Sequence, residues 1–361
     1  MARLFLIFSF ISFSLECLAQ TIEENPVINP VVPLSCTPVK DQSISSTCWS
    51  FASNSFIESE LLRMGNREFD LSEMFTARMS YLQKIKTHLK TGGQNYFTPG
   101  GQFQDVQWVL KKYGIVPEDV YNGKPRKEYA HNHQILDTLM SFKIKSMLAD
   151  GKKEPDSLDW KYINNCLDKY LGKLPSAFQF DEKQVTPLNF MKKVLKFNPD
   201  DYIEITSYSH HPWYKPFVLE NKYNWMSAEY MNVPLADFLR ITNEALKNGY
   251  SVLWDGDVSE TGFNFYDNIA FLPDTIKILA DERQRTFADS SSYLDHMMHI
   301  VGKTTDNKGR KWYYVKNSWG TNGNKERGFL YMNENYFAIK TAAIVVHKAA
   351  IPADIKKKIG L

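Results

Sequence analysis

The apolar pattern of this chain changes at about residue 250. Up to that point the strongest apolar patterns have helical spacing, whereas beyond it short runs rich in β-branched and aromatic residues are separated by Gly, Asn and Asp. Runs of that kind indicate strands joined by turns. A helical front followed by a strand-rich back predicts an α+β fold with a cleft between the two halves. The expected strands cover residues 250–255, 297–302, 312–316, 328–332 and 342–347.

Five segments of the front part have the apolar spacing of helices. In the first of them Trp49, Ala52 and Phe56 recur on one face, with Glu and Arg between the apolar positions. Ser46 or Thr47 is a suitable N-cap residue for this helix. The expected helices cover residues 46–64, 103–113, 156–171, 186–196 and 234–248.

The chain is almost electrically balanced. Its 361 residues include 43 Lys and Arg against 41 Asp and Glu, so the formal net charge is +2. A protein that binds nucleic acid would carry a clustered basic excess, so the composition argues against nucleic acid as a partner. At about 150 residues per domain, the length corresponds to two domains or one large composite unit.

The N-terminal segment has the layout of a secretory signal peptide. Arg3 precedes an apolar run over residues 4–15, and Ala19 stands where cleavage would follow. The run is too short to cross a bilayer, because a membrane-spanning helix needs about 20 residues. We therefore expect residues 1–19 to be removed and the mature protein to be exported, periplasmic or secreted, without stable membrane insertion.

Removal of this leader would leave three cysteines, Cys36, Cys48 and Cys166. An odd number cannot pair fully within one chain, so at least one thiol is expected to be free. Cys166 lies on the apolar stripe of the expected helix over residues 156–171, and we interpret it and Cys36 as structural. The free thiol of interest is therefore Cys48.

Cys48 stands at the start of the first expected helix. Unpaired backbone N–H groups and the helix dipole favour an anion there, and the thiolate is the nucleophilic form of cysteine. Because a lone cysteine is more often a small buried apolar residue, position alone does not decide its role. A nucleophilic thiol also needs a base and a group that orients the base, and His296 and Asn317 follow in that order. Gln42 lies close enough to offer an oxyanion donor.

Several motifs together resemble those of the papain-like cysteine peptidases. They are Gln42 six residues before Cys48-Trp49-Ser50-Phe51, His296 six residues before Gly302, and Asn317-Ser318-Trp319-Gly320. Further segments are similar to the bleomycin hydrolase or aminopeptidase C branch: Gly100-Gly101-Gln102, His210-His211-Pro212, Lys215-Pro216-Phe217 and Trp254-Asp255-Gly256-Asp257-Val258. The resemblance implies a papain-like two-lobed fold, a helical lobe plus a β-barrel-like lobe, with a helical insertion at about 120–250.

The resemblance also implies a role for each matching residue. Cys48 would be the nucleophile, His296 the base and acid, and Asn317 the residue that orients His296. The side-chain amide of Gln42 and the backbone N–H of Cys48 would hold the oxyanion. Trp319 would shield the bond between His296 and Asn317 beside the bound substrate. The branch requires no metal or other cofactor.

The other histidines are expected to take no part in the chemistry. His299 lies three positions after His296, an odd offset that places it on the opposite face of the strand, so we expect a packed or surface residue. His210 and His211 could form a metal pair. Adjacent side chains on an extended segment diverge, however, and no partner recurs at ligand spacing, so we predict no metal site.

Substrate-binding residues are expected on both sides of the nucleophile. Gly100 and Gly101 would let an extended substrate backbone approach closely, although paired glycines are also typical of a tight turn. The resemblance implies that the C-terminal arm, about 349–361, lies in the cleft. We expect the Leu361 carboxylate to face the ammonium group of the substrate. A frayed basic tail is the alternative, because Lys356-Lys357-Lys358 lies within this arm.

These inferences predict a cysteine aminopeptidase that acts on peptide substrates. An endopeptidase on the same scaffold is the first alternative, and an exported interaction protein without catalysis is the second. The peptidase domain is expected to cover residues 42–361. Residues 20–41, with three prolines and no helical periodicity, are expected to form an extended arm. The resemblance also implies a homo-oligomer, which in that branch is often a hexamer.

Overall fold

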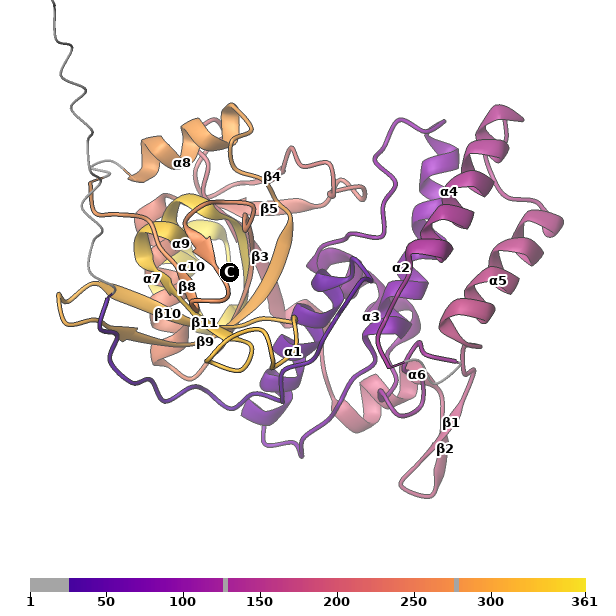
Figure 1. Cartoon of the computed structure of the whole chain (residues 1–361), viewed down its shortest axis with the longest axis horizontal. Coiled ribbons are helices and arrows are strands. Elements are labelled where there is room, and N and C mark those ends of the chain that lie inside the picture. Colours follow the sequence, from indigo (N-terminus) through magenta and orange to yellow (C-terminus); the bar gives the residue numbers. More distant parts are fainter. Residues whose placement is uncertain (1–25, 126–128, 276–278) are drawn as a thin grey trace, which may run out of the picture.

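The computed structural model describes residues 26–125, 129–275 and 279–361. The predicted signal peptide over residues 1–19 lies outside this part of the chain. Figure 1 shows two lobes side by side, one made of helices α2 to α6 and the other built on the large sheet, with α1 between them. None of the helices in the described part is long and apolar enough to cross a membrane.

The described ranges contain helices in both halves of the chain, and the longest, α2, lies in the first half. Their bounds are α1 Cys48–Arg63, α2 Glu73–Lys90, α3 Phe103–Tyr113, α4 Gln134–Ala149, α5 Ser157–Leu171, α6 Pro187–Asn189, α7 Leu235–Lys247, α8 Leu279–Ala288, α9 Glu334–Lys340 and α10 Ala353–Ile359. A π-helical turn, Phe190–Leu195, continues α6.

The strands form one sheet of ten and a separate hairpin of β1 and β2. Their bounds are β1 Phe178–Phe180, β2 Lys183–Val185, β3 Tyr202–Thr206, β4 Pro216–Val218, β5 Glu229–Asn232, β6 Val252–Gly256, β7 Phe263–Asn264, β8 Ile269–Ala270, β9 His296–Thr305, β10 Lys311–Lys316, β11 Phe329–Asn333 and β12 Thr341–His347. The order across the sheet is β4-β5-β3-β12-β6-β9-β10-β11-β8-β7. The central strands β12, β6, β9 and β10 pair antiparallel with their neighbours in this order.

All five expected helices and all five expected strands are present, with ends that differ by a few residues. The expected helical insertion at about 120–250 differs from the structure in its second half. Residues 202–232 contain β3, β4 and β5, and β3 pairs with β12 in the large sheet. This region therefore contributes to both lobes.

The segment before α1 is extended, as predicted for the part of it that is described. Its backbone runs beside β9, where the N–H of Asn29 donates to Thr305 O at 3.0 Å and that of Leu34 donates to Val301 O at 2.7 Å. Asp41 then bridges to Trp319. The arm thus crosses from the sheet lobe to the start of α1 and brings the chain to the junction of the lobes.

Two apolar cores lie on either side of the sheet. One core fills the helical lobe and includes Leu253 and Met297 from the sheet face that α1 covers. The other lies between the opposite face and helices α7, α9 and α10, with Trp254 and Ile300 among its members. Because α1 is buried on almost every side, its N-terminus is held firmly at the boundary between the lobes.

Candidate active site

Cys48 is the first residue of α1, at the junction of the two lobes. The carbonyl oxygen of Thr47 accepts hydrogen bonds from the N–H groups of Ser50 and Phe51, which closes the first turn of the helix. The hydroxyl groups of Ser45 and Thr47 are 2.5 Å apart and hydrogen-bond to each other, so Thr47 caps the helix with its backbone alone. The half-buried Cys48 side chain lines a cleft.

His296 begins β9 on the other side of this cleft, and Asn317 follows the end of β10. His296 Nε2 lies 2.7 Å from Asn317 Oδ1. An amide oxygen only accepts, so Nε2 carries the proton and Nδ1 is the imidazole nitrogen that can accept one. The backbone N–H of Ser318 also donates to Asn317 Oδ1, at 2.7 Å, which fixes the orientation of the amide. The structure therefore joins two residues that are 21 positions apart in sequence in the way the motifs predict.

Trp319 and Gln42 complete the group around His296. The indole of Trp319 packs on the imidazole of His296, with 4.8 Å between ring centroids, and both side chains line the cleft. Gln42 Oε1 accepts a hydrogen bond from Ser318 Oγ at 2.7 Å, and its backbone N–H donates to Ser318 O at 2.9 Å. With its oxygen held in this way, the side-chain NH₂ group of Gln42 is available to an oxyanion beside Cys48.

The cleft has a volume of about 430 Å³ and is bounded on the helical side by Gly100 and Gly101. Neither glycine has a positive φ, and the segment is not a tight turn. A Cβ atom on Gly101 would lie 2.9 Å from the indole of Trp49, so only glycine fits there. Lys84 Nζ donates to the carbonyl oxygen of Gly100, whereas no hydrogen bond within the described residues occupies the backbone of Gly101. The Gly101 backbone is thus free to bind an extended substrate.

Burial disfavours the charged forms of both the thiol and the imidazole. It raises the pKa of Cys48 to about 12, and the carboxylates of Asp255 and Asp295 add to this rise, whereas the backbone N–H groups of Met297 and Trp49 oppose it. Burial also lowers the pKa of His296, against the opposing effect of its bond to Asn317. Burial of Cys48 thus opposes the thiolate that the helix N-terminus favours. The Cys48 proton has to pass to His296 as the substrate is attacked.

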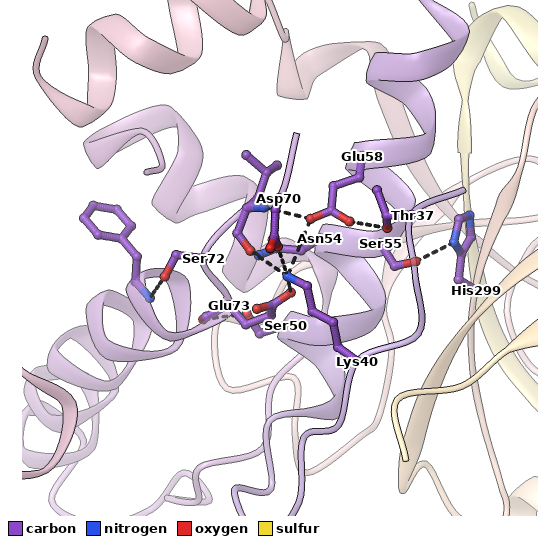
Figure 2. A network of polar contacts seen from close by, with 12 residues as sticks. Thr37, Lys40, Ser50, Asn54, Ser55, Glu58, Asp70, Ser72, Glu73 and His299 are labelled. Carbon is purple, nitrogen blue, oxygen red and sulfur yellow. Dashed lines mark hydrogen bonds and ion pairs between the residues drawn. The ribbon is translucent and has the colours of Figure 1, made fainter. Parts of the chain in front are cut away.

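A buried polar network joins α1 to β9 and β10, and Figure 2 shows its contact between Ser55 and His299. Ser55 of α1 lies 2.9 Å from Nδ1 of His299, and Lys316 Nζ donates to Ser55 Oγ at 2.8 Å. Lys316 also donates to Thr37 of the N-terminal arm, at 3.1 Å. Since His299 and Lys316 are close in sequence to His296 and Asn317, these bonds hold the two sides of the cleft in register. His299 is fully buried, so of the two predicted outcomes, a packed or a surface residue, the packed one is confirmed.

The predicted position of Leu361 is wrong. The residues that line the cleft come from positions 42–319, and none belongs to the C-terminal arm. Residues 353–359 instead form α10, whose Ile355 and Ile359 are buried in the core beneath α7. An ion pair between Asp354 and Arg240 ties the helix to α7. Apolar packing thus directs the C-terminus away from the cleft, and the arm is not frayed either.

One surface cluster has the composition of a metal site. The ligand atoms of His210, His211 and Glu220 all lie within 4.8 Å of one another. The two histidine side chains do not diverge as predicted, because their ring centroids are 4.4 Å apart and both rings contact Glu220. The cluster is at least partly exposed on the sheet lobe, and its residues do not line the catalytic cleft.

The cleft also contains residues that sequence reasoning did not assign to it. Asp255 of β6 and Asp295, directly before β9, both line it, as do Tyr223 and Ser259. Asp255 belonged to a motif that served only to indicate the family. Its place in the cleft depends on the pairing of Asp255 with Met297 across β6 and β9, which the sequence pattern does not reveal.

The chain is similar to known proteins over most of its length. The sequence matches the Peptidase C1-like family over residues 14–360. This chain belongs to the Peptidase C1-like family. The match covers almost the whole chain, so the resemblance to papain-like cysteine peptidases is confirmed, and the protein is a cysteine peptidase of the α+β class.

Named relatives of this Peptidase C1-like chain include aminopeptidases. Aminopeptidase C of Lactobacillus delbrueckii subsp. lactis is 26% identical, with 90% of this chain and 83% of that protein aligned. Mitochondrial cysteine proteinase 1 of Saccharomyces cerevisiae (strain JAY291) is 23% identical, with 93% and 80% aligned. The crystal structure of PepW from Lactobacillus rhamnosis HN001 superimposes with a TM-score of 0.73 at 22% identity, over 93% of this chain and 85% of that one. The fold is thus that of known papain-like enzymes.

Proposed function

We propose that this protein is a cysteine aminopeptidase that removes N-terminal residues from peptides through an acyl-enzyme on Cys48. The observation that carries the proposal is the bond between His296 Nε2 and Asn317 Oδ1 in the cleft that Cys48 lines. This bond leaves Nδ1 as the proton acceptor for a thiol. Relatives named aminopeptidase C, at 26% identity over most of the chain, support the choice of reaction.

The reaction has two stages, formation of the acyl-enzyme and its hydrolysis, and His296 transfers a proton in both. Cys48 transfers its proton to Nδ1 of His296 while its sulfur bonds to the scissile carbonyl carbon, and the oxyanion accepts from the Gln42 amide and the Cys48 N–H. His296 then gives the proton to the leaving amine, which departs as the C–N bond breaks. In the second stage His296 takes a proton from water as the hydroxide attacks the thioester, and returns it to the Cys48 sulfur.

An endopeptidase is the second candidate, and one observation favours it. The C-terminal arm packs on α7 and does not line the cleft. None of the described lining residues comes from this arm, so the arm does not block the path of a substrate chain beyond its N-terminus. A longer substrate could therefore extend past Cys48 in both directions. The two candidates differ in how they treat a peptide whose N-terminus is blocked.

Rates on matched free and blocked substrates test the proposal. We expect the protein to hydrolyse leucyl-7-amido-4-methylcoumarin with kcat/KM at least about 100-fold above that for the N-acetylated compound, because binding the free ammonium group stabilises the transition state. Fluorescence release gives both rates. Equal or faster cleavage of the acetylated substrate, or of internal bonds in a blocked peptide, would show an endopeptidase.

We also propose that the protein is exported and forms a homo-oligomer. The charged residue, apolar run and small residues of positions 1–19 support export. The family resemblance supports self-association. The N-terminal sequence of the protein recovered from its native compartment and the mass of the particle by light scattering measure the two properties directly.

A further inference from the structure

Among the described residues that line the cleft, acidic side chains outnumber basic ones. The described residues that line the cleft include the carboxyl groups of Asp255 and Asp295. Their other titratable side chains are Cys48, Tyr223 and His296, and none is Lys or Arg. A cleft walled by carboxylates attracts cations and raises their local concentration. A substrate part with a positive charge is therefore the part that this cleft is built to receive.

The two carboxyl groups differ in the number of hydrogen bonds that they accept from the protein. Both oxygens of Asp295 are held, Oδ1 by the N–H of Val258 at 2.9 Å and Oδ2 by the hydroxyl of Ser259. Asp255, although only 7% exposed, accepts one hydrogen bond within the described residues, from Gln102 Nε2 to Oδ2 at 3.2 Å. It has no ion pair with a described residue. A buried carboxyl group in this condition is stable as its anion only when a cation from outside the protein binds beside it.

Asp255 lies near the position of the reacting bond. It pairs directly with Met297 across β6 and β9, and opposed residues of an antiparallel pair have Cα atoms about 4.5–5.5 Å apart. The backbone N–H of Met297 lies close enough to the Cys48 thiol to oppose the rise in its pKa. The α-nitrogen of an N-terminal residue is two bonds from the carbonyl carbon that Cys48 attacks. The protein group that binds the α-nitrogen must therefore lie near Cys48, as Asp255 does through its pairing with Met297.

We propose that the Asp255 carboxylate receives the ammonium group of the substrate's free N-terminus and thereby selects N-terminal residues for cleavage. This inference rests on the proposed aminopeptidase function. It assigns to Asp255 the role predicted for Leu361, which does not line the cleft and is 49% exposed. Gln102 holds one oxygen of the carboxylate and leaves the other for the ammonium group.

The protonation of Asp255 agrees with this role. Burial raises its pKa to about 8, with the Asp295 carboxylate adding to the rise and the hydrogen bond from Gln102 opposing it. An ammonium group would supply the opposite charge, and Asp255 would release its proton as the substrate binds.

The test compares two substrates that differ only in the ammonium group. These are leucyl-7-amido-4-methylcoumarin and its des-amino counterpart, 4-methylpentanoyl-7-amido-4-methylcoumarin. In Asp255→Asn, which keeps the shape of the side chain, we expect kcat/KM for the leucyl substrate to fall by about 30-fold or more, because a buried charge pair is lost. The des-amino substrate should be unaffected. Asp281→Asn, the same charge change on the exposed face of α8, should alter neither rate.

Inhibition constants give the same comparison without turnover. Leucinamide should inhibit the Asp255→Asn variant much more weakly than the wild type, whereas 4-methylpentanamide should inhibit both alike. Equal losses for both substrates, with equal shifts for both inhibitors, would overturn the inference. A loss confined to arginyl and lysyl substrates would overturn it too, because Asp255 would then bind a side chain. A wild-type protein inactive on the leucyl substrate would instead contradict the proposed function.

Discussion

Replacing Cys48 with alanine is expected to lower the rate of hydrolysis by about four orders of magnitude or more. The substitution removes the atom that bonds to the scissile carbon, and the remaining oxyanion donors and binding contacts supply only a small residual rate. The helix itself should persist, because Thr47 closes the first turn with its backbone carbonyl and alanine is a good helix former. Steady-state rates on an aminoacyl coumarin substrate, together with the circular dichroism spectrum, measure both effects.

The other described cysteines provide the matched control. Cys166, partly buried beside the helical core, is also a free thiol. Cys166→Ala should retain wild-type kcat and lose only a small amount of stability. If Cys48→Ala kept more than about a hundredth of the wild-type rate, the assignment of the nucleophile would be wrong, since losses of that size arise from positioning rather than from removal of the reacting group.

The Lys40→Met substitution is expected to lower the free energy of unfolding by about 3–5 kcal/mol at pH 8, because it leaves buried carboxylates unpaired. Figure 2 shows the Lys40 ammonium group between Glu73 of α2 and Glu58 of α1, and its distances to them are 2.7 and 3.8 Å. Both side chains are at most 2% exposed. Lys40 also pairs with the exposed Asp70. Urea unfolding followed by tryptophan fluorescence measures the loss.

The loss should be smaller at pH 5.5 than at pH 8. Burial opposes the charge on Lys40, but its carboxylate neighbours hold its pKa well above 10.5, so the lysine is charged at both pH values. Burial raises the pKa of Glu73 to about 7 even beside Lys40, and without the lysine this pKa rises further. At pH 5.5 the unpaired carboxyl groups of the variant are therefore protonated and cost less.

A surface ion pair serves as the control for Lys40. Lys247, 65% exposed, pairs with Glu244 at 3.6 Å on α7. Lys247→Met should cost less than about 1 kcal/mol at either pH, since exposed pairs contribute little. A comparably small loss in Lys40→Met at pH 8, or a loss that grows toward pH 5.5, would contradict the role of the lysine in the network.

Local patterns predicted the elements whose signals lie within a few residues. Helix α3 has a clear apolar face and ends at Gly114, whose φ of +84° suits glycine, so its bounds follow from the sequence. Helix α2 was missed because polar side chains are buried on it. Glu73 and Arg78 point inward to partners on distant segments, Lys40 and Asp168, and only tertiary contacts make this stable.

The candidate site was predictable to the extent that motifs mark it. Gln42, Cys48, His296 and Asn317 could be named because their types and spacing resemble a family. Asp255 could not be placed, because its position in the cleft follows from strand pairing over 42 positions, with Met297. The packing of the C-terminal arm could have been predicted from a local pattern, but the family resemblance favoured a position in the cleft instead. Ile351, Ile355 and Ile359 recur every four residues, the spacing of a helix with a buried face.

The most direct test of the account is to identify the residue that bonds to the substrate carbon. We would treat the protein with leucyl chloromethyl ketone, a substrate analogue with a free amine that alkylates the attacking nucleophile, and locate the added mass by peptide mass spectrometry. The account predicts one adduct, on Cys48, formed at a rate that matches the loss of activity and absent from Cys48→Ala. Inactivation accompanied by an adduct on Cys36, Cys166 or another residue, with Cys48 unmodified, would contradict it.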